Sequence, residues 1–298
     1  MAGCFSFTAS GNRCFRIYFA SAGMKSKQIE LDDGTTMHCW VPKKTSNKPA
    51  LILIHGLGAN AMWQWSSQLR PFRRHFNLYV PDLLFFGRSF TTRPEKTELF
   101  QSQCVMKLVE KLGVSKFHVA GVSYGGFVAY HLAHLYPHAV QKVVLIAAGV
   151  CLEEKDMQEG LLNAPDLETA ISILLPQTAA NLKKLLKLSF VRAAPKMVPS
   201  CLLQDFIANM VTDRRDERIE LINNLIAGRK ASDLPVIHQE TLIIWGEHDQ
   251  IFPLELGNRL KRHLGDRAEL VLFKDAGHGV HVEKSTKFNS QLKKFLLG

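Results

Sequence analysis

The sequence of 298 residues has no C-x-x-C pair, no apolar run of membrane-spanning length and no internal repeat. Metal and redox motifs built on closely spaced cysteines are therefore absent. A membrane-spanning helix needs roughly 20 apolar residues, and no run approaches that length. The six cysteines are widely spread, which predicts a reduced, cytoplasmic setting. They are Cys4, Cys14, Cys39, Cys104, Cys151 and Cys201.

Basic residues outnumber acidic ones, 37 to 27, and the net charge is +10. They form no stripe interleaved with aromatic residues, so we do not expect nucleic-acid binding. Weak attraction to an anionic membrane surface stays open.

Residues 1–26 contain no acidic side chain and are treated as an N-terminal extension. This composition is compatible with a transit peptide or a membrane-surface helix. We favour a helix that packs Phe5, Phe15 and Phe19 on the domain. Peripheral membrane contact through the extension or the cap described next stays open.

Strand-like and helix-like runs alternate in residues 27–150 and again in residues 239–298. This alternation predicts an α/β core in which helices cover both faces of a mostly parallel central sheet. Residues 151–238 interrupt it with helical periodicity, punctuated by prolines and without a strand. We expect this segment to form a helical cap, or lid, over a site on the core.

A glycine-x-serine-x-glycine pattern occurs at residues 121–125, between an apolar run and a helix-like run. In that context it predicts a nucleophile elbow, in which a strand ends, the chain turns at a serine and a helix begins. Gly121 and Gly125 allow the close approach of strand and helix. Ser123 is therefore the candidate nucleophile.

A serine hydroxyl needs a base to remove its proton and a third group to orient that base. Asp249 follows a buried strand and is the candidate acid, with Glu247 as a neighbouring alternative. His278, in a loop after the next strand, is the candidate base. His281 competes with it, but we interpret it as a neighbour of the site or a surface residue. His248 either lines the pocket or has no role.

Negative charge that develops on a carbonyl oxygen during serine attack is stabilised by backbone N–H groups. Tyr124, directly after the nucleophile, and Leu57, in the loop His55-Gly56-Leu57-Gly58, are the expected donors.

Other polar residues after strands or on helices have simpler interpretations. Asp82 is assigned a structural role, bonding the backbone of its own loop. His131, His134 and His138 have helical spacing on the elbow helix, and we interpret them as surface residues, not metal ligands.

These motifs together resemble the α/β-hydrolase superfamily over nearly the whole chain from about residue 27. The resemblance is to its capped serine esterases and monoacylglycerol-lipase-like members, including uncharacterised plant members. It implies the α/β-hydrolase fold with Ser123, Asp249 and His278 as catalytic triad, Leu57 and Tyr124 as oxyanion hole, and neither cofactor nor metal. Epoxide hydrolases and haloalkane dehalogenases carry aspartate where Ser123 stands, and the extended HGGG loop of one carboxylesterase branch is absent.

The leading hypothesis is a serine esterase that cleaves a carboxylic ester with a hydrophobic acyl or aromatic group. The apolar content of the cap predicts that kind of substrate. A carbon–carbon bond hydrolase or an acyltransferase using the same triad stays open, as does a ligand-binding receptor or switch with weak hydrolysis. Receptors of this fold typically have shorter caps than residues 151–238. The oligomeric state is not set by the sequence.

Overall fold

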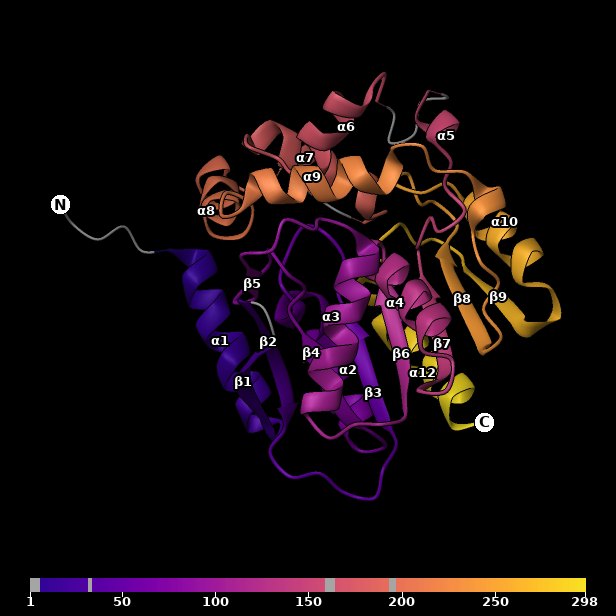
Figure 1. The fold of residues 1–298 in the computed structure, drawn as a ribbon. Helices are drawn as coiled ribbons and strands as arrows, with labels where there is room; N and C mark the ends of the chain where they lie inside the picture. The colour runs from indigo at the N-terminus through magenta and orange to yellow at the C-terminus, as the bar shows by residue number, and fades with distance from the viewer. Residues whose placement is uncertain (1–5, 32–33, 159–163, 193–196) are drawn as a thin grey trace.

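The computed structural model describes residues 6–31, 34–158, 164–192 and 197–298, and these form one nine-stranded sheet with helices on both faces (Figure 1). The strand order is β1-β2-β4-β3-β6-β7-β8-β9, with β5 paired to β2. The strands are β1 (Met24–Glu30), β2 (Thr35–Pro42), β3 (Ala50–Ile54), β4 (Asn77–Pro81), β5 (Phe90–Thr91), β6 (Phe117–Val122), β7 (Val140–Ile146), β8 (Glu240–Gly246) and β9 (Ala268–Phe273).

Neighbouring strands in the series β4-β3-β6-β7-β8-β9 pair in parallel. The pairs that β2 forms with β1, β4 and β5 are antiparallel. Every residue of β3 and β6 is buried, because helices cover both faces of a parallel sheet. The predicted α/β fold with a mostly parallel sheet is confirmed. β1 begins at Met24, inside the stretch that the sequence assigned to the N-terminal extension.

Helices cover the two faces as separate layers. One core cluster joins the sheet to α1, α2 and α12, and the other joins it to α3, α4, α10 and the helices that follow β7. The core helices are α1 (Phe7–Ser21), α2 (Ala61–Arg73), α3 (Glu98–Lys111), α4 (Tyr124–Leu135), α10 (Leu254–Leu264), α11 (Val280–Glu283) and α12 (Ser285–Leu297), with a short 3-10 turn η4 (Gly265–Arg267).

Between β7 and β8 the described residues contain helices and no strand, and Figure 1 shows these helices above the carboxyl ends of the central strands. Leu182, Leu188 and Leu203 join the same buried cluster as the core beneath them, which fixes the helices on the sheet. They are α5 (Glu154–Gln158), α6 (Leu167–Leu174), α7 (Ala179–Ser189), α8 (Ser200–Met210), α9 (Arg215–Ile226) and the 3-10 turn η3 (Ala231–Asp233).

The N-terminal segment forms helix α1, which packs on α2 and α8. Phe19 is fully buried, and Phe15 packs on the same cluster, as the sequence predicts. Phe5 lies outside the described residues. Phe7 and Ile17 remain 54% and 60% exposed, so α1 buries only part of its apolar surface. Among the described residues, no helix combines the length and apolar character needed to cross a membrane.

Candidate active site

The turn between β6 and α4 holds Ser123 at φ 53°, ψ −123°, a left-handed conformation that costs a non-glycine residue free energy. Tight packing keeps it there. A Cβ on Gly121 would lie 2.1 Å from the Gly125 carbonyl oxygen, and a Cβ on Gly125 would lie 2.4 Å from the His55 carbonyl oxygen. The glycines are therefore required by the close approach of strand, helix and neighbouring loop. The turn has the geometry of a nucleophile elbow.

The loops after β8 and β9 bring Asp249 and His278 together. The His278 Nδ1–H donates to Asp249 Oδ2 at 2.9 Å, and the Asp249 side chain is fully buried. Asp249 Oδ1 accepts from the backbone N–H groups of Ile251 and Phe252 at 2.8 and 2.9 Å, which fixes the carboxylate. The Phe252 ring lies edge-on to the imidazole, with centroids 5.6 Å apart. Because Nδ1 carries the proton, Nε2 is the nitrogen free to accept one.

Ser123 and His278 line the same cavity, which has a volume of about 350 Å³. A smaller lobe of about 30 Å³ also opens at Ser123. Apart from His278, His281 and Tyr124, no titratable residue is found among the described residues that line either space. The wall opposite the core loops comes from α6, α7, the residue after α7, and α8, with Leu174, Leu182, Leu185, Leu186, Phe190 and Phe206.

The loop after β3 lies against the elbow, with Gly56 so close that a Cβ there would be 2.9 Å from the Ser123 Cβ. Leu57 lines both lobes, and Tyr124 opens α4 and lines the smaller one. The first N–H groups of a helix have no acceptor within it, so the Tyr124 N–H is available. The structure thus brings both expected oxyanion donors to the serine.

Gln64, which no sequence pattern singles out, holds this loop in shape. Gln64 on α2 accepts from the Gly56 N–H at 2.8 Å and donates to the carbonyl oxygens of Gly56, Leu57 and Ala59 at 3.0 to 3.2 Å. One glutamine on a helix carries no sequence signal, because its partners are set by the tertiary fold.

His55 fixes the other side of the loop. Its Nε2 accepts from the Leu83 N–H at 2.9 Å, so its Nδ1–H donates to the Gly56 carbonyl oxygen at 2.8 Å. Burial lowers the pKa of His55, and the ring is held neutral in this tautomer.

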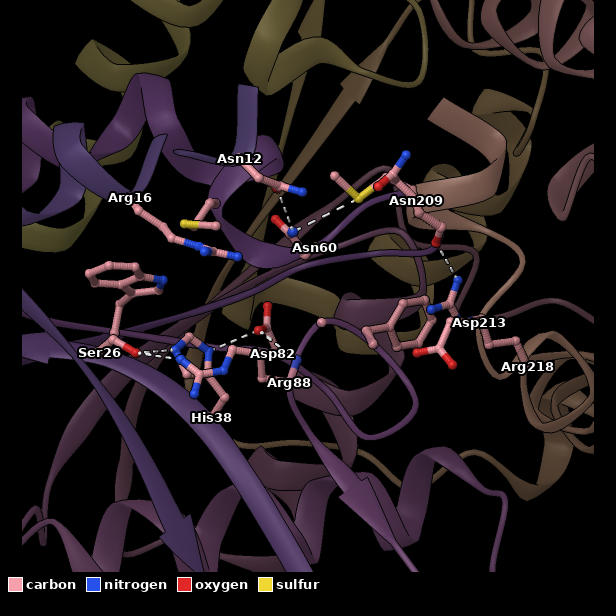
Figure 2. A pocket seen from close by; sticks show the side chains of 15 residues that line it. Asn12, Arg16, Ser26, His38, Asn60, Asp82, Arg88, Asn209, Asp213 and Arg218 are labelled. Atoms are coloured by element: carbon pink, nitrogen blue, oxygen red, sulfur yellow. Dashed lines mark hydrogen bonds and ion pairs between the residues drawn. The ribbon is translucent and has the colours of Figure 1, made fainter. Parts of the chain in front are cut away.

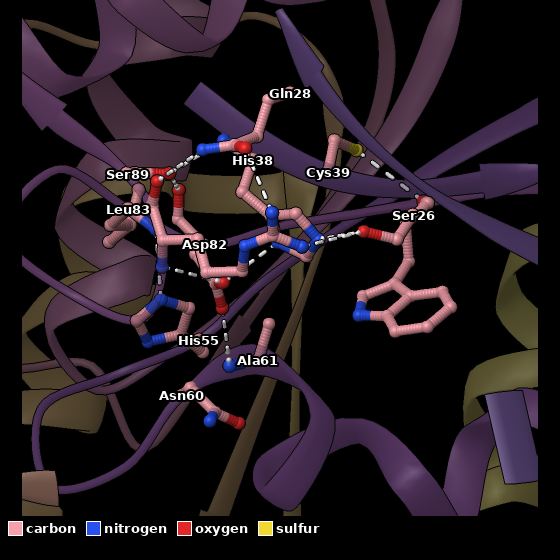
Figure 3. Close-up of polar contacts among 12 residues, drawn as sticks. Ser26, Gln28, His38, Cys39, His55, Asn60, Ala61, Asp82, Leu83 and Ser89 are labelled. Atoms are coloured by element: carbon pink, nitrogen blue, oxygen red, sulfur yellow. Dashed lines mark hydrogen bonds and ion pairs between the residues drawn. The ribbon is translucent and has the colours of Figure 1, made fainter. Parts of the chain in front are cut away.

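Asp82 lies beside a separate polar cavity (Figure 2) and has the predicted role of bonding loop backbone. It accepts from the N–H groups of Ala61 and Arg88 at 3.1 and 3.4 Å. Its Oδ2 also accepts from His38 Nδ1 at 2.8 Å, and His38 Nε2 is 2.8 Å from Ser26 Oγ (Figure 3). Although these are serine, histidine and aspartate, Ser26 lies within a regular strand and not on an elbow. We assign this network a structural role.

The remaining histidines fall in different places. His281 is buried at the wall of the Ser123 cavity, between Trp65 and Phe288, so the surface interpretation is wrong and the neighbour-of-site interpretation fits. Its pKa is lowered to about 3, chiefly by burial. His248 is exposed, 3.8 Å from Glu247.

The three histidines expected on the elbow helix lie in different surroundings. His131 Nε2 is 3.4 Å from Glu98 Oε1, whereas His138 lies beyond the end of α4 at Leu135. Within the described ranges, no group of three or more histidine, cysteine or acidic residues could hold a metal.

The sequence profile of the family described as alpha/beta hydrolase fold matches residues 49–285. The chain therefore belongs to the α/β-hydrolase fold family.

Relatives within the family differ in the chemistry that their names print. A 2-hydroxy-6-oxononadienedioate/2-hydroxy-6-oxononatrienedioate hydrolase of Pseudomonas sp. is 29% identical over 83% of this chain and 87% of its own. The monoacylglycerol lipase ABHD6 of Bos taurus is 25% identical over 98% of this chain and 89% of its own. Among solved structures, the 2-hydroxy-6-oxo-6-phenylhexa-2,4-dienoate hydrolase of Rhodococcus sp. strain RHA1 superposes with a TM-score of 0.75, at 22% identity over 92% of this chain and 99% of that one.

Proposed function

We propose that this protein is a serine hydrolase that cleaves neutral carboxylic esters with a hydrophobic acyl or aromatic group. The observation that carries the proposal is the opening of the Ser123 elbow and of His278, bonded to Asp249, into one apolar cavity. Burying a hydrophobic acyl chain there gains about 25 cal/mol per Å² of apolar surface.

In the proposed reaction, Ser123 Oγ attacks the ester carbonyl carbon and His278 Nε2 takes the hydroxyl proton. Asp249 stabilises the imidazolium that forms. The N–H groups of Leu57 and Tyr124 donate to the oxyanion, and each such donor is typically worth roughly 3 kcal/mol. As the tetrahedral intermediate collapses, His278 gives its proton to the leaving alcohol. The acyl group stays bonded to Ser123.

Hydrolysis of the acyl-enzyme reverses these roles. His278 takes a proton from water, the hydroxide attacks the acyl carbon, and the proton returns to Ser123 Oγ as the acid leaves. The reaction consumes one water and needs no cofactor.

A second candidate, hydrolysis of a carbon–carbon bond, is favoured by the names of several relatives. Their substrates are named as dienoates, which are carboxylate anions. A carboxylate buried in an apolar site needs a cation or several hydrogen-bond donors. Within the described part of the chain, no lysine or arginine lines either lobe at Ser123. We therefore prefer a neutral ester.

Purified protein assayed with two substrate classes tests this choice. One arm measures release from p-nitrophenyl esters of increasing chain length and from a monoacylglycerol, and the other follows loss of absorbance of a 2-hydroxy-6-oxo-dienoate. We expect multiple turnovers on the esters, abolished by Ser123→Ala and kept by Ser67→Ala, whose exposed side chain is on α2. Faster turnover of the dienoate would favour the second candidate, and a single turnover with tight binding would favour a receptor.

A further inference from the structure

A cavity of about 320 Å³ lies between α1, the β1–β2 hairpin, the loop after β4, and the residues from the end of α8 to the start of α9 (Figure 2). It shares no lining residue with the cavity at Ser123. Asn12 and Trp63 separate the two, since the Trp63 indole N–H donates to Asn12 Oδ1 at 2.9 Å. Asn12 faces the polar cavity and Trp63 faces the apolar one. The polar cavity is thus independent of the proposed triad.

Positive charge exceeds negative charge on its walls, because three guanidinium groups face two carboxylates. The carboxylate of Asp82 already accepts from His38 and from two backbone N–H groups. Figure 2 shows Arg16, Ser26 and Arg88 on one side of the cavity, and Arg218 and Asp213 on the other.

Arg218 is a buried cation, only 4% exposed. Its Nε donates to the Phe85 carbonyl oxygen at 2.8 Å and its Nη1 to the Met210 carbonyl oxygen at 2.6 Å, and it stacks 4.3 Å from the centre of the Phe86 ring. No carboxylate of the described residues lies within 4 Å of it. Burial lowers its pKa to about 10, which still leaves it charged at neutral pH. The carboxylates of Asp213 and Glu217 offset this effect of burial only in part. A buried charge without a direct ion pair costs free energy that a closer anion would reduce.

The other side of the cavity offers donors without acceptors. The Trp40 side chain is 5% exposed, and its Nε1–H meets no acceptor among the described residues. A buried indole N–H usually has a partner. Arg16 likewise makes no hydrogen bond or ion pair within the described ranges. Arg88 donates only to neutral side-chain oxygens, those of Gln28 and Ser26 at 2.8 and 3.3 Å, so its charge is not neutralised.

We propose that this cavity binds the oxyanion group of a small ligand, a phosphate or a carboxylate. Arg16 and Arg88 supply the charge, and the Trp40 N–H supplies a further hydrogen bond. Arg218, across the cavity, adds a favourable field. Charge-assisted hydrogen bonds from guanidinium to oxyanion are among the strongest that proteins make in water.

Titration calorimetry on the full chain with inorganic phosphate, and separately with acetate, tests the site. Ionic strength is held constant with sodium chloride, because salt screens exposed charges. We expect saturable binding of at least one of them. Arg16→Gln weakens it about tenfold, the loss expected for one charge-assisted contact, and Trp40→Phe weakens it severalfold. Tighter phosphate binding identifies a phosphate ligand, and acetate binding of equal or greater strength identifies a carboxylate.

Matched variants separate this site from general electrostatics. Arg13→Gln removes an exposed charge from the same helix but outside the cavity, and Trp65→Phe removes another unpartnered buried indole N–H away from it. Both controls, and Ser123→Ala, are expected to bind as wild type. The proposal is overturned if neither anion binds saturably, if Arg13→Gln weakens binding as much as Arg16→Gln, or if folded Trp40→Phe binds as wild type. Since Arg16 is exposed and unpartnered, its variant is expected to fold.

Discussion

Replacing Asp249 by asparagine tests the proposed roles of Asp249 as acid and His278 as base. The carboxylate has two separate tasks. Its Oδ1 accepts from two backbone N–H groups, and its Oδ2 accepts from the His278 Nδ1–H at 2.9 Å. Asparagine keeps the shape and one oxygen, so the backbone bonds are retained. The amide nitrogen takes the place of Oδ2, and it can only donate.

The substitution therefore changes the tautomer of the histidine. Nδ1 must accept from the amide, the ring proton moves to Nε2, and Nε2 can no longer take the proton of Ser123. In a triad with this geometry the loss in kcat is about 10⁴-fold, equivalent to about 5 kcal/mol of transition-state stabilisation. KM is expected to change little, because Asp249 does not line the cavity.

The measurement is steady-state hydrolysis of a p-nitrophenyl ester by Asp249→Asn, with thermal unfolding to verify that the variant is folded. Glu247→Gln is the matched control, since this acid is two residues away, was the alternative candidate and is exposed. We expect wild-type kcat from the control. If folded Asp249→Asn keeps kcat within tenfold of wild type, or if Glu247→Gln carries the loss instead, the assignment of the acid is wrong.

Three further predictions concern the elbow, the buried His281 and the apolar wall of the Ser123 cavity that contains Leu186. Gly121→Ala places a methyl group 2.1 Å from a backbone oxygen of α4, so we expect denaturant melts to show a loss of roughly 3 kcal/mol or more. His281 is neutral in the fold, with a pKa of about 3; because the unfolded ring protonates below its ordinary value of about 6.5, stability falls as pH decreases from 6.5 towards 3. In His281→Phe the new ring packs on Trp65 and Phe288 and cannot be protonated, so stability should fall less steeply with decreasing pH. If stability depended on pH between pH 7 and pH 5 as steeply as in wild type, the prediction would be wrong. Leu186→Trp narrows the larger lobe, so kcat/KM should fall at least tenfold for octanoyl esters but little for acetyl esters. An equal loss on both esters would show that the acyl group does not bind in that lobe.

The sequence was sufficient to predict the sheet, the elbow and the residues that gather around it. Parallel strands end at one edge of a sheet, so loops after β3, β6, β8 and β9 meet there whatever the details of packing. Chain order and strand position therefore predicted that Ser123, Asp249 and His278 would be neighbours. The glycines at 121 and 125 added a constraint that only a tight strand-to-helix turn explains.

Contacts between distant segments were not predictable in the same way. A surface position for His281 was compatible with the sequence, because the spacing of residues on a short helix does not predict which of its faces α2 covers. Asp82 was correctly read as a backbone acceptor, but its partner His38 comes from the antiparallel hairpin, and no local pattern links the two. The unpartnered donors of the polar cavity, Arg16 and the Trp40 N–H, lie where α1 meets β2, a junction that hydrophobic periodicity does not specify.

The division between loops and helices allows the substrate of this fold to change while the catalytic groups stay the same. The proposed catalytic groups come from loops of the sheet, whereas one apolar wall of the Ser123 cavity comes from α6, α7 and α8. A change of substrate therefore needs changes in the wall and none in the triad. The chain is 29% identical to the dienedioate hydrolase and 25% identical to the monoacylglycerol lipase. These identities do not show which of the two has the more similar substrate, because most matched positions lie outside the wall. The wall of this chain is apolar and its described part lacks a cation, and that chemistry favours a neutral ester over an anionic dienoate.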